Sequence, residues 1–280
     1  MAIDNPPPAP AQRIYRHRLP VRVMHWINVL SLTLLLMSGL NIFNAHPALY
    51  WGKESTFAAP WLAIRARQTS AGPVGVTQFG GREWRTTGVL GLSEVEGQTQ
   101  SRAFPSWATV PGPQWLSMAR RWHFFFAWVF VINGVAYLLY TLFSRHLTRD
   151  LLPTRAELRG IGSSIRNHLL LRHPTGEAAK RYNVLQSLAY LAVIFGLLPL
   201  LVVAGLAMSP RLDAVYGGWV DLLGGRQSAR SLHFIAAAGL LLFTLIHLFE
   251  VIVAGVWNEI RSMLTGWYTV PADKHTKGQP

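Results

Sequence analysis

Four histidines lie inside long apolar stretches of this sequence, where an ionisable side chain is rare unless it has a function. Two of them, His233 and His247, are fourteen residues apart in the segment SLHFIAAAGLLLFTLIHLFE, and His25 and His123 each begin another such stretch. Fourteen residues make almost four turns of an α-helix and rise about 21 Å, so His233 and His247 point the same way. Because neutral imidazoles bind metal ions and haem iron, this pattern predicts a metal or redox centre.

The composition predicts that membrane-spanning helices position these histidines. Only 14% of the 280 residues are charged, whereas soluble domains contain about 25%. The expected fold is an all-α integral membrane protein, a bundle of four transmembrane helices with a long external loop between the first two. A soluble protein with four core helices is the alternative, but its helices should show a charged face. The expected helices cover residues 22–44, 120–143, 184–208 and 231–257.

The net charge of +13 is distributed as in a membrane protein rather than in a nucleic-acid-binding protein. Basic residues gather in residues 1–22, up to the start of the first helix, and in residues 144–183, between the second and third helices. The positive-inside rule places both segments, and therefore both chain ends, in the cytoplasm. Residues 45–119 and 209–230 are then expected on the opposite side of the membrane.

This orientation pairs the four histidines by depth. The first helix runs outward and the second and fourth run inward, so His25 and His247 lie near the inner face and His123 and His233 near the outer face. Each pair can bind one haem iron from both sides, which leaves no open coordination position and suits electron transfer. Hydrogen-bonded packing is the ordinary alternative for a single histidine, but four at matching depths favour two haems b. Cysteine is absent from the sequence, which excludes disulfides, thiolate-bound iron–sulfur clusters and covalent c-type haem.

Small and basic residues near the histidines suggest how the haems are accommodated. Gly39 and Gly134 each share a helix face with a histidine, where a missing side chain would clear space for a porphyrin or simply allow close helix packing. Three arginines each lie just before a histidine and could pair with haem propionates or lie at the membrane surface. They are Arg22, Arg121 and Arg230.

Glu250 is the only acidic residue within the core of an expected helix, one turn after His247. It could relay protons to quinone, or it could be a carboxylate that faces water at the headgroup level. Residues 154–171 are expected to form an amphipathic helix on the inner face. The remaining histidines are expected to be solvated surface residues, and they are His17, His46, His146, His168, His173 and His275.

The segments HRLPVRVMHWINVLSLTLLLMSGL and RRWHFFFAWVFVINGVAYLLY, with the helix that carries His233 and His247, resemble a known family. This is the bacterial di-haem cytochrome b family of the cytochrome b561 and nickel-hydrogenase cytochrome b type, to which the formate dehydrogenase gamma subunit is related. The resemblance implies one di-haem domain over residues 1–280 in the inner membrane, with a periplasmic loop at 45–119 and a cytoplasmic loop at 144–183. It also implies two haems b bound by His25, His123, His233 and His247.

Members of this family connect a peripheral oxidoreductase to the quinone pool. The long loop, with five tryptophans among Gly and Pro, resembles the branch that serves periplasmic molybdopterin enzymes of the sulfite-oxidase type. We therefore expect an electron-transfer subunit with such a partner and with quinone as substrate. A nickel-iron hydrogenase or formate dehydrogenase partner is the alternative within the class. A histidine-lined metal-ion transporter, which should place carboxylate or sulfur ligands near the histidines, and an anchor without a cofactor are the alternatives outside it.

Overall fold

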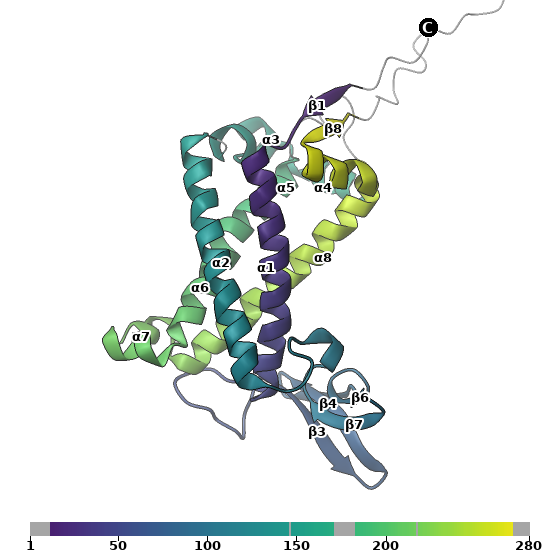
Figure 1. Cartoon of the computed structure of the whole chain (residues 1–280), viewed down its shortest axis with the longest axis vertical. Helices are drawn as coiled ribbons and strands as arrows, with labels where there is room; N and C mark the ends of the chain where they lie inside the picture. The colour runs from purple at the N-terminus through teal and green to yellow at the C-terminus, as the bar shows by residue number, and fades with distance from the viewer. Residues whose placement is uncertain (1–11, 146, 171–182, 217, 271–280) are drawn as a thin grey trace, which may run out of the picture. The chain divides into compact units, whose positions relative to one another are not determined.

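The computed structural model describes residues 12–145, 147–170, 183–216 and 218–270. In this part of the chain, four helical stretches are long and apolar enough to cross a membrane (Figure 1). They are Leu19–Asn44 (α1), Leu116–Phe143 (α2), Val184–Ala207 and Arg226–Thr265 (α8). The four expected helices are thus confirmed, and α1, α2 and α8 begin before their expected starts.

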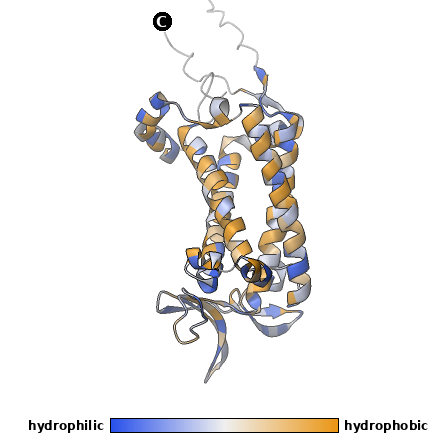
Figure 2. Cartoon of the chain, turned by 90° about the vertical axis from the view of Figure 1, so that its left-hand side faces the viewer, coloured by the Kyte–Doolittle hydropathy of each residue, from blue (hydrophilic) through white to orange (hydrophobic). Residues whose placement is uncertain are grey.

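The outer surfaces of these helices are apolar, as lipid contact requires. Figure 2 shows the long helices coloured mostly in the hydrophobic range. Large side chains on them, such as Phe125, Trp128 and Ile252, are more than 60% exposed. Apolar surface of this extent is rare on a soluble monomer, which argues against the soluble four-helix alternative.

Two of the four stretches are not regular α-helices throughout. The third consists of α5 (Val184–Ala192), a π-helical turn (Val193–Leu197) and α6 (Leu198–Ala207). Pro199 has no amide hydrogen and its ring clashes with the carbonyl four residues earlier, and a wider preceding turn relieves this clash. In α8, Gly255 has a φ of 111°, which lies outside the helical range and marks a kink close to the expected helix end at residue 257.

The segment between α1 and α2 is folded into strands, so the expected all-α class is wrong for residues 45–119. One antiparallel sheet has the order β2 (Ala48–Leu49), β3 (Leu62–Thr69), β4 (Gly72–Phe79) and β5 (Arg82–Arg85), and β6 (Gly91–Val95) pairs with β7 (Gln98–Arg102). Gly80 and Gly81 join β4 to β5 with φ values of 55° and 80°, as a two-residue hairpin turn requires. A Gly-Gly pair between two apolar segments predicts a hairpin, so the sequence contains a signal for these strands although residues 45–119 are expected to form a loop.

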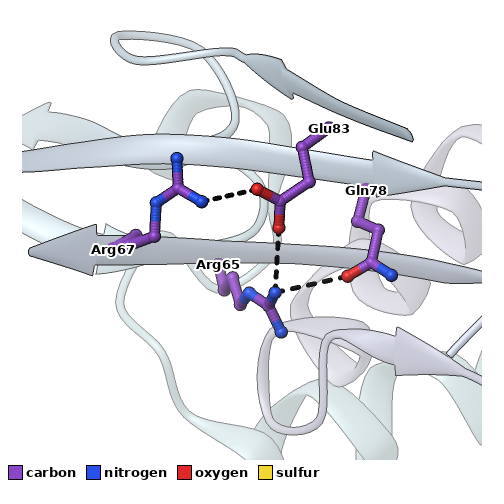
Figure 3. Close-up of polar contacts among 4 residues, drawn as sticks. All are labelled: Arg65, Arg67, Gln78 and Glu83. Atoms are coloured by element: carbon purple, nitrogen blue, oxygen red, sulfur yellow. Dashed lines mark hydrogen bonds and ion pairs between the residues drawn. The ribbon is translucent and has the colours of Figure 1, made fainter. Parts of the chain in front are cut away.

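Polar side chains connect the three longer strands of this sheet. Glu83 on β5 accepts hydrogen bonds from Arg65 and Arg67 on β3, with N–O distances of 3.0 and 2.5 Å (Figure 3). Arg65 also donates to the Gln78 side chain on β4, at 3.3 Å. The guanidinium groups are about half exposed, so each pair contributes at most ~1 kcal/mol. An apolar core next to the sheet is formed by Phe43, Leu49, Leu62, Ile64 and Ala103.

The chain divides into two compact units. The terminal unit comprises residues 1–26, 136–196 and 241–280, and the sheet unit comprises residues 27–135 and 197–240. Each unit contains one end of α1, of α2 and of α8. His25 and His247 belong to the terminal unit, whereas His123 and His233 belong to the sheet unit.

In the terminal unit, the start of α1 is tied to the end of α8. β1 (Arg13–Tyr15) pairs antiparallel with β8 (Trp267–Thr269). The guanidinium carbon of Arg16 lies 4.5 Å from the centre of the Tyr268 ring. The indole nitrogen of Trp26 donates to the carbonyl of Met263 at 3.2 Å. These contacts hold the residues next to His25 against α8.

Two short helices stand where the amphipathic helix at 154–171 is expected. α3 (Arg155–Arg159) and α4 (Ile161–Leu169) are separated at Gly160. Thr154 and Glu157 form a capping box at the start of α3, in which each side chain bonds the backbone nitrogen of the other residue. The expected helical character is therefore confirmed, but the helix is interrupted because Gly160 favours termination.

Candidate haem sites

In the sheet unit, α2 and α8 bring His123 and His233 together. Their ring centroids are 6.2 Å apart and their planes are inclined by 64°. An imidazole nitrogen lies about 2 Å from a metal that it binds, so two rings on opposite sides of one iron have centroids roughly 6 Å apart. The observed spacing leaves room for one metal atom between the rings and fits haem ligation by two histidines.

Hydrogen bonds determine which ring nitrogen each of these histidines presents. The Nδ1 atom of His233 lies 2.8 Å from the carbonyl oxygen of Leu201, which can only accept, so Nδ1 carries the proton. The Nδ1 atom of His123 makes a similar contact with α1, where it lies 3.1 Å from the hydroxyl oxygen of Ser38. With Nδ1 occupied, Nε2 keeps its lone pair for a metal, which is the arrangement usual for histidine ligands.

Glycines lie against both rings. A Cβ atom at Gly39 would be 3.4 Å from Cε1 of His123, and one at Gly205 would be 3.3 Å from Cε1 of His233. Gly205 is on α6, in a helix where the sequence predicts no site residue, although a glycine inside an apolar helix is itself a packing signal. A Cβ at Gly134 would meet no described atom within 4 Å, so this glycine borders open space.

In the terminal unit, His25 of α1 and His247 of α8 form the second pair. Their ring centroids are 6.5 Å apart, with planes inclined by 68°. Phe243, one turn before His247, stacks on that ring at 6.0 Å and 11°, and Tyr190 of α5 contacts Phe243 edge-on at 6.2 Å. Trp26 lies edge-on to His25 at 5.5 Å. Within the described residues, neither imidazole of this pair has a hydrogen bond to a ring nitrogen.

The three arginines next to the histidines lie in different surroundings. Arg230 donates to the carbonyl oxygens of His46 and Ala48, at 3.0 Å for Ala48. Arg121 is exposed at the start of α2. Arg22 has a buried Nε that finds no hydrogen-bond partner in the described part of the chain. An unpaired buried donor beside His25 fits an anionic group such as a propionate.

Glu250 is paired with a histidine that sequence reasoning places in solvent. Its Oε1 lies 3.3 Å from Nε2 of His168 on α4, and the Glu250 side chain is only 16% exposed. The expectation of a solvated surface residue is wrong for His17, which is 8% exposed, whereas the His168 side chain is 37% exposed. His46 is partly buried. The expectations for His146, His173 and His275 fall outside the described residues.

The donor set does not resemble a site for a free metal ion. In the described residues, no group of three or more His, Cys, Asp or Glu side chains could hold one. A metal-ion transporter should surround its histidines with such ligands. Two facing imidazoles alone suit an iron whose other ligands come from a porphyrin.

Known proteins are similar to this chain over most of its length. A protein of Azospira oryzae named as protein-methionine-sulfoxide reductase subunit YedZ1 is 26% identical over 257 residues, which cover 91% of this chain and 99% of that protein. No solved structure matches the chain significantly. Residues 16–266, which include all four histidines, match the prokaryotic cytochrome b561 family. The chain therefore belongs to the prokaryotic cytochrome b561 family, whose members bind haem b, and is a multi-pass membrane protein.

Proposed function

We propose that this chain is a di-haem b-type subunit that transfers electrons between a periplasmic oxidoreductase and the quinone pool. The observation that carries this proposal is the pair of imidazole couples at centroid distances of 6.2 and 6.5 Å. His123 and His233 would hold one haem, and His25 and His247 the other. When bound there, haem would supply one-electron transfer.

The charge distribution supports a location in a bacterial inner membrane with both chain ends in the cytoplasm. Residues 1–22 and 144–183 are rich in arginine, and such segments remain on the cytoplasmic side. The His25–His247 pair then lies toward the cytoplasm and the His123–His233 pair toward the periplasm. The strands of the sheet unit are on the periplasmic side, where a partner protein can dock.

The name of the Azospira oryzae relative supports a reductase as the partner, rather than a hydrogenase or formate dehydrogenase. We propose a molybdopterin enzyme of the sulfite-oxidase type that accepts electrons drawn from quinol. The docking surface on this chain would include Trp51 and Phe79, which are about half exposed. Their ring centroids each lie 5.8 Å from that of Trp61, with Trp51 stacked on Trp61 and Phe79 edge-on to it. The indole nitrogen of Trp61 donates to Ser231 at 2.9 Å, two residues before His233. These contacts connect the proposed docking surface to the helix that carries the haem ligand His233, within the sheet unit.

The contact between the Glu250 carboxylate and the His168 imidazole is our proposed proton acceptor for quinol. Oxidation of a quinol to a quinone releases two electrons and two protons, and a carboxylate and an imidazole can each accept one proton. Glu250 is one turn after His247, so a proton accepted here is released close to one histidine pair.

The haem content of the purified chain tests the function. A reduced-minus-oxidised spectrum with chemical haem quantitation should show two haems b per chain. A colourless protein would support the anchor without a cofactor, and bound zinc or manganese in place of haem would support a transporter. Co-purification with a periplasmic molybdopterin protein would support the proposed partner class, whereas co-purification with a hydrogenase would show that the partner belongs to that class instead.

A separate measurement tests the quinone site. We expect Glu250→Gln and His168→Gln each to slow the reduction of the cytochrome by a soluble quinol about tenfold or more, while dithionite still reduces all the haem. The double variant should lose little more than either single one, because the two side chains act as a pair. Glu94→Gln, at an exposed acid on β6, is the matched control. Unchanged quinol rates in Glu250→Gln would remove this carboxylate from the quinone site.

A further inference from the structure

Ser38 has a position on α1 that packing alone does not explain. It is fully buried, and its hydroxyl lies 2.6 Å from the carbonyl oxygen of Leu34 and 3.2 Å from that of Leu35. The same oxygen is 3.1 Å from Nδ1 of His123 on α2. A serine hydroxyl has one hydrogen, and here a backbone carbonyl accepts it. The contact with His123 must therefore run the other way, with Nδ1–H donating to the hydroxyl oxygen.

This direction fixes the state of the ligand. A proton held on Nδ1 leaves the lone pair of His123 on Nε2, the nitrogen available to a metal. A hydrogen bond from Nδ1–H to an acceptor also makes the imidazole a more basic ligand. A more basic ligand stabilises the oxidised, more positively charged iron over the reduced iron. Removal of the acceptor should therefore make the centre easier to reduce.

We infer that Ser38 is a positioning residue that accepts a hydrogen bond from Nδ1–H of His123 and lowers the reduction potential of the haem that His123 and His233 would hold. This inference rests on the proposed di-haem function. It assigns to α1 a role in the His123–His233 pair, in addition to the ligand His25 that the same helix supplies to the pair with His247. His233, the other member, is held by the carbonyl of Leu201, which no side-chain substitution can remove.

Ser38→Ala tests the inference, and Ser31→Ala is the matched control. Ser31 is also fully buried on α1, but its hydroxyl has no hydrogen-bond partner in the described residues. The Leu35 carbonyl is a second acceptor beside the His123 ring, so Ser38→Ala should retain its haem with binding weakened by about tenfold. Spectroscopic redox titration should show one of the two haems shifted to a more positive potential and the other unchanged. Ser38→Thr keeps the hydroxyl and should restore the wild-type potential.

The results separate the inference from the proposed function. A wild-type chain with fewer than two haems would defeat the di-haem proposal itself. Two haems in the wild type with both potentials unchanged in Ser38→Ala would overturn only the role of Ser38. Equal shifts in Ser38→Ala and Ser31→Ala would also overturn it, because they would indicate a general effect of removing a buried hydroxyl. A change in the electron paramagnetic resonance signal of one oxidised haem alone would support altered ligation of that centre.

Discussion

The sheet unit holds its histidine pair by directional contacts, whereas the terminal unit holds its pair by aromatic packing. His123 and His233 each make a hydrogen bond through Nδ1, and each ring packs against a glycine. His25 and His247 are bordered by Trp26 and Phe243 instead. A hydrogen bond fixes both the ring orientation and its proton, while stacking fixes the ring plane only. Similar ring spacing can thus be reached by two kinds of support, and the pairs should respond differently to substitution.

The largest expected effect comes from the histidines themselves. Each change of one of the four histidines to alanine should remove one haem and leave the other, because a site with a single axial imidazole binds haem much more weakly. His123→Ala and His233→Ala should retain the same haem, and His25→Ala and His247→Ala should retain the other, as judged by the spectrum and potential of the remaining centre. His46→Ala is the control and should retain both.

The same experiment tests which histidines share a haem. If His123→Ala and His25→Ala left the same haem, the couples formed within the two units would not be the ligand couples. Retention of both haems in His247→Ala would contradict the assignment of that histidine.

Sequence reasoning predicts the four spans and the couples because both depend on strong one-dimensional signals. Apolar length predicts a span, and a histidine near one end of a span of known direction has a known depth. The supports depend on contacts between segments far apart in the sequence. Ser38, Gly205 and Phe243 are ordinary residues of apolar helices, and nothing in the sequence shows which of them faces a histidine. The strands between α1 and α2 are missed for a different reason, since their aromatic and glycine content also fits a docking loop.

The next largest effect on haem binding should come from larger side chains at the two glycines that contact histidine rings, Gly39 and Gly205. This effect should be confined to the haem of the sheet unit. A side chain at Gly205 must displace the His233 ring, because even its Cβ would be 3.3 Å from Cε1. Overpacking of this kind costs about 1–3 kcal/mol, so Gly205→Leu should weaken haem binding at that site by a factor of roughly 5 to 150. Haem retention during dialysis against apomyoglobin measures this loss for each centre.

Gly134 offers a comparison that sharpens the role of small residues. Gly134→Ala places its Cβ in open space and should leave both haems in place. Gly134→Leu should release haem only if this glycine clears space for the porphyrin, which is one of the two roles that the sequence suggests for it. Full haem retention in Gly134→Leu would assign Gly134 to helix packing or lipid contact instead.

A smaller effect is expected where stacking supports the ligand. Phe243→Leu removes the ring that stacks on His247. Aromatic pairs contribute about 0.5–1.5 kcal/mol beyond the burial of area, which corresponds to roughly two- to tenfold weaker binding. The loss should appear only for the haem of the terminal unit. Phe234→Leu, on the same helix but next to the core of the sheet unit, is the matched control, and loss of the same haem in both variants would count against stacking as the support.

The smallest effect is a pH dependence confined to the sheet unit. Burial, and secondly the positive charge of Arg230, lower the pKa of His46, which follows α1. In the unfolded chain this pKa is about 6.5, so the unfolded state binds the proton more readily than the folded state. The stability that neutral His46 contributes is therefore present above about pH 6.5 and is lost as the pH falls toward the lowered pKa.

Because the stability that neutral His46 contributes falls with falling pH, the two haems can be compared at acid and alkaline pH. The haem of the sheet unit should be released faster at pH 5 than at pH 8, and His46→Gln, which cannot be protonated, should reduce that difference. Release from the terminal unit should be the same in the variant and the wild type, because His46 belongs to the sheet unit. Protonation of the ligand histidines weakens both sites in both proteins, so the informative quantity is the difference between variant and wild type at each haem. An equal change at both haems would mean that acid acts through the ligands or the whole fold and not through His46.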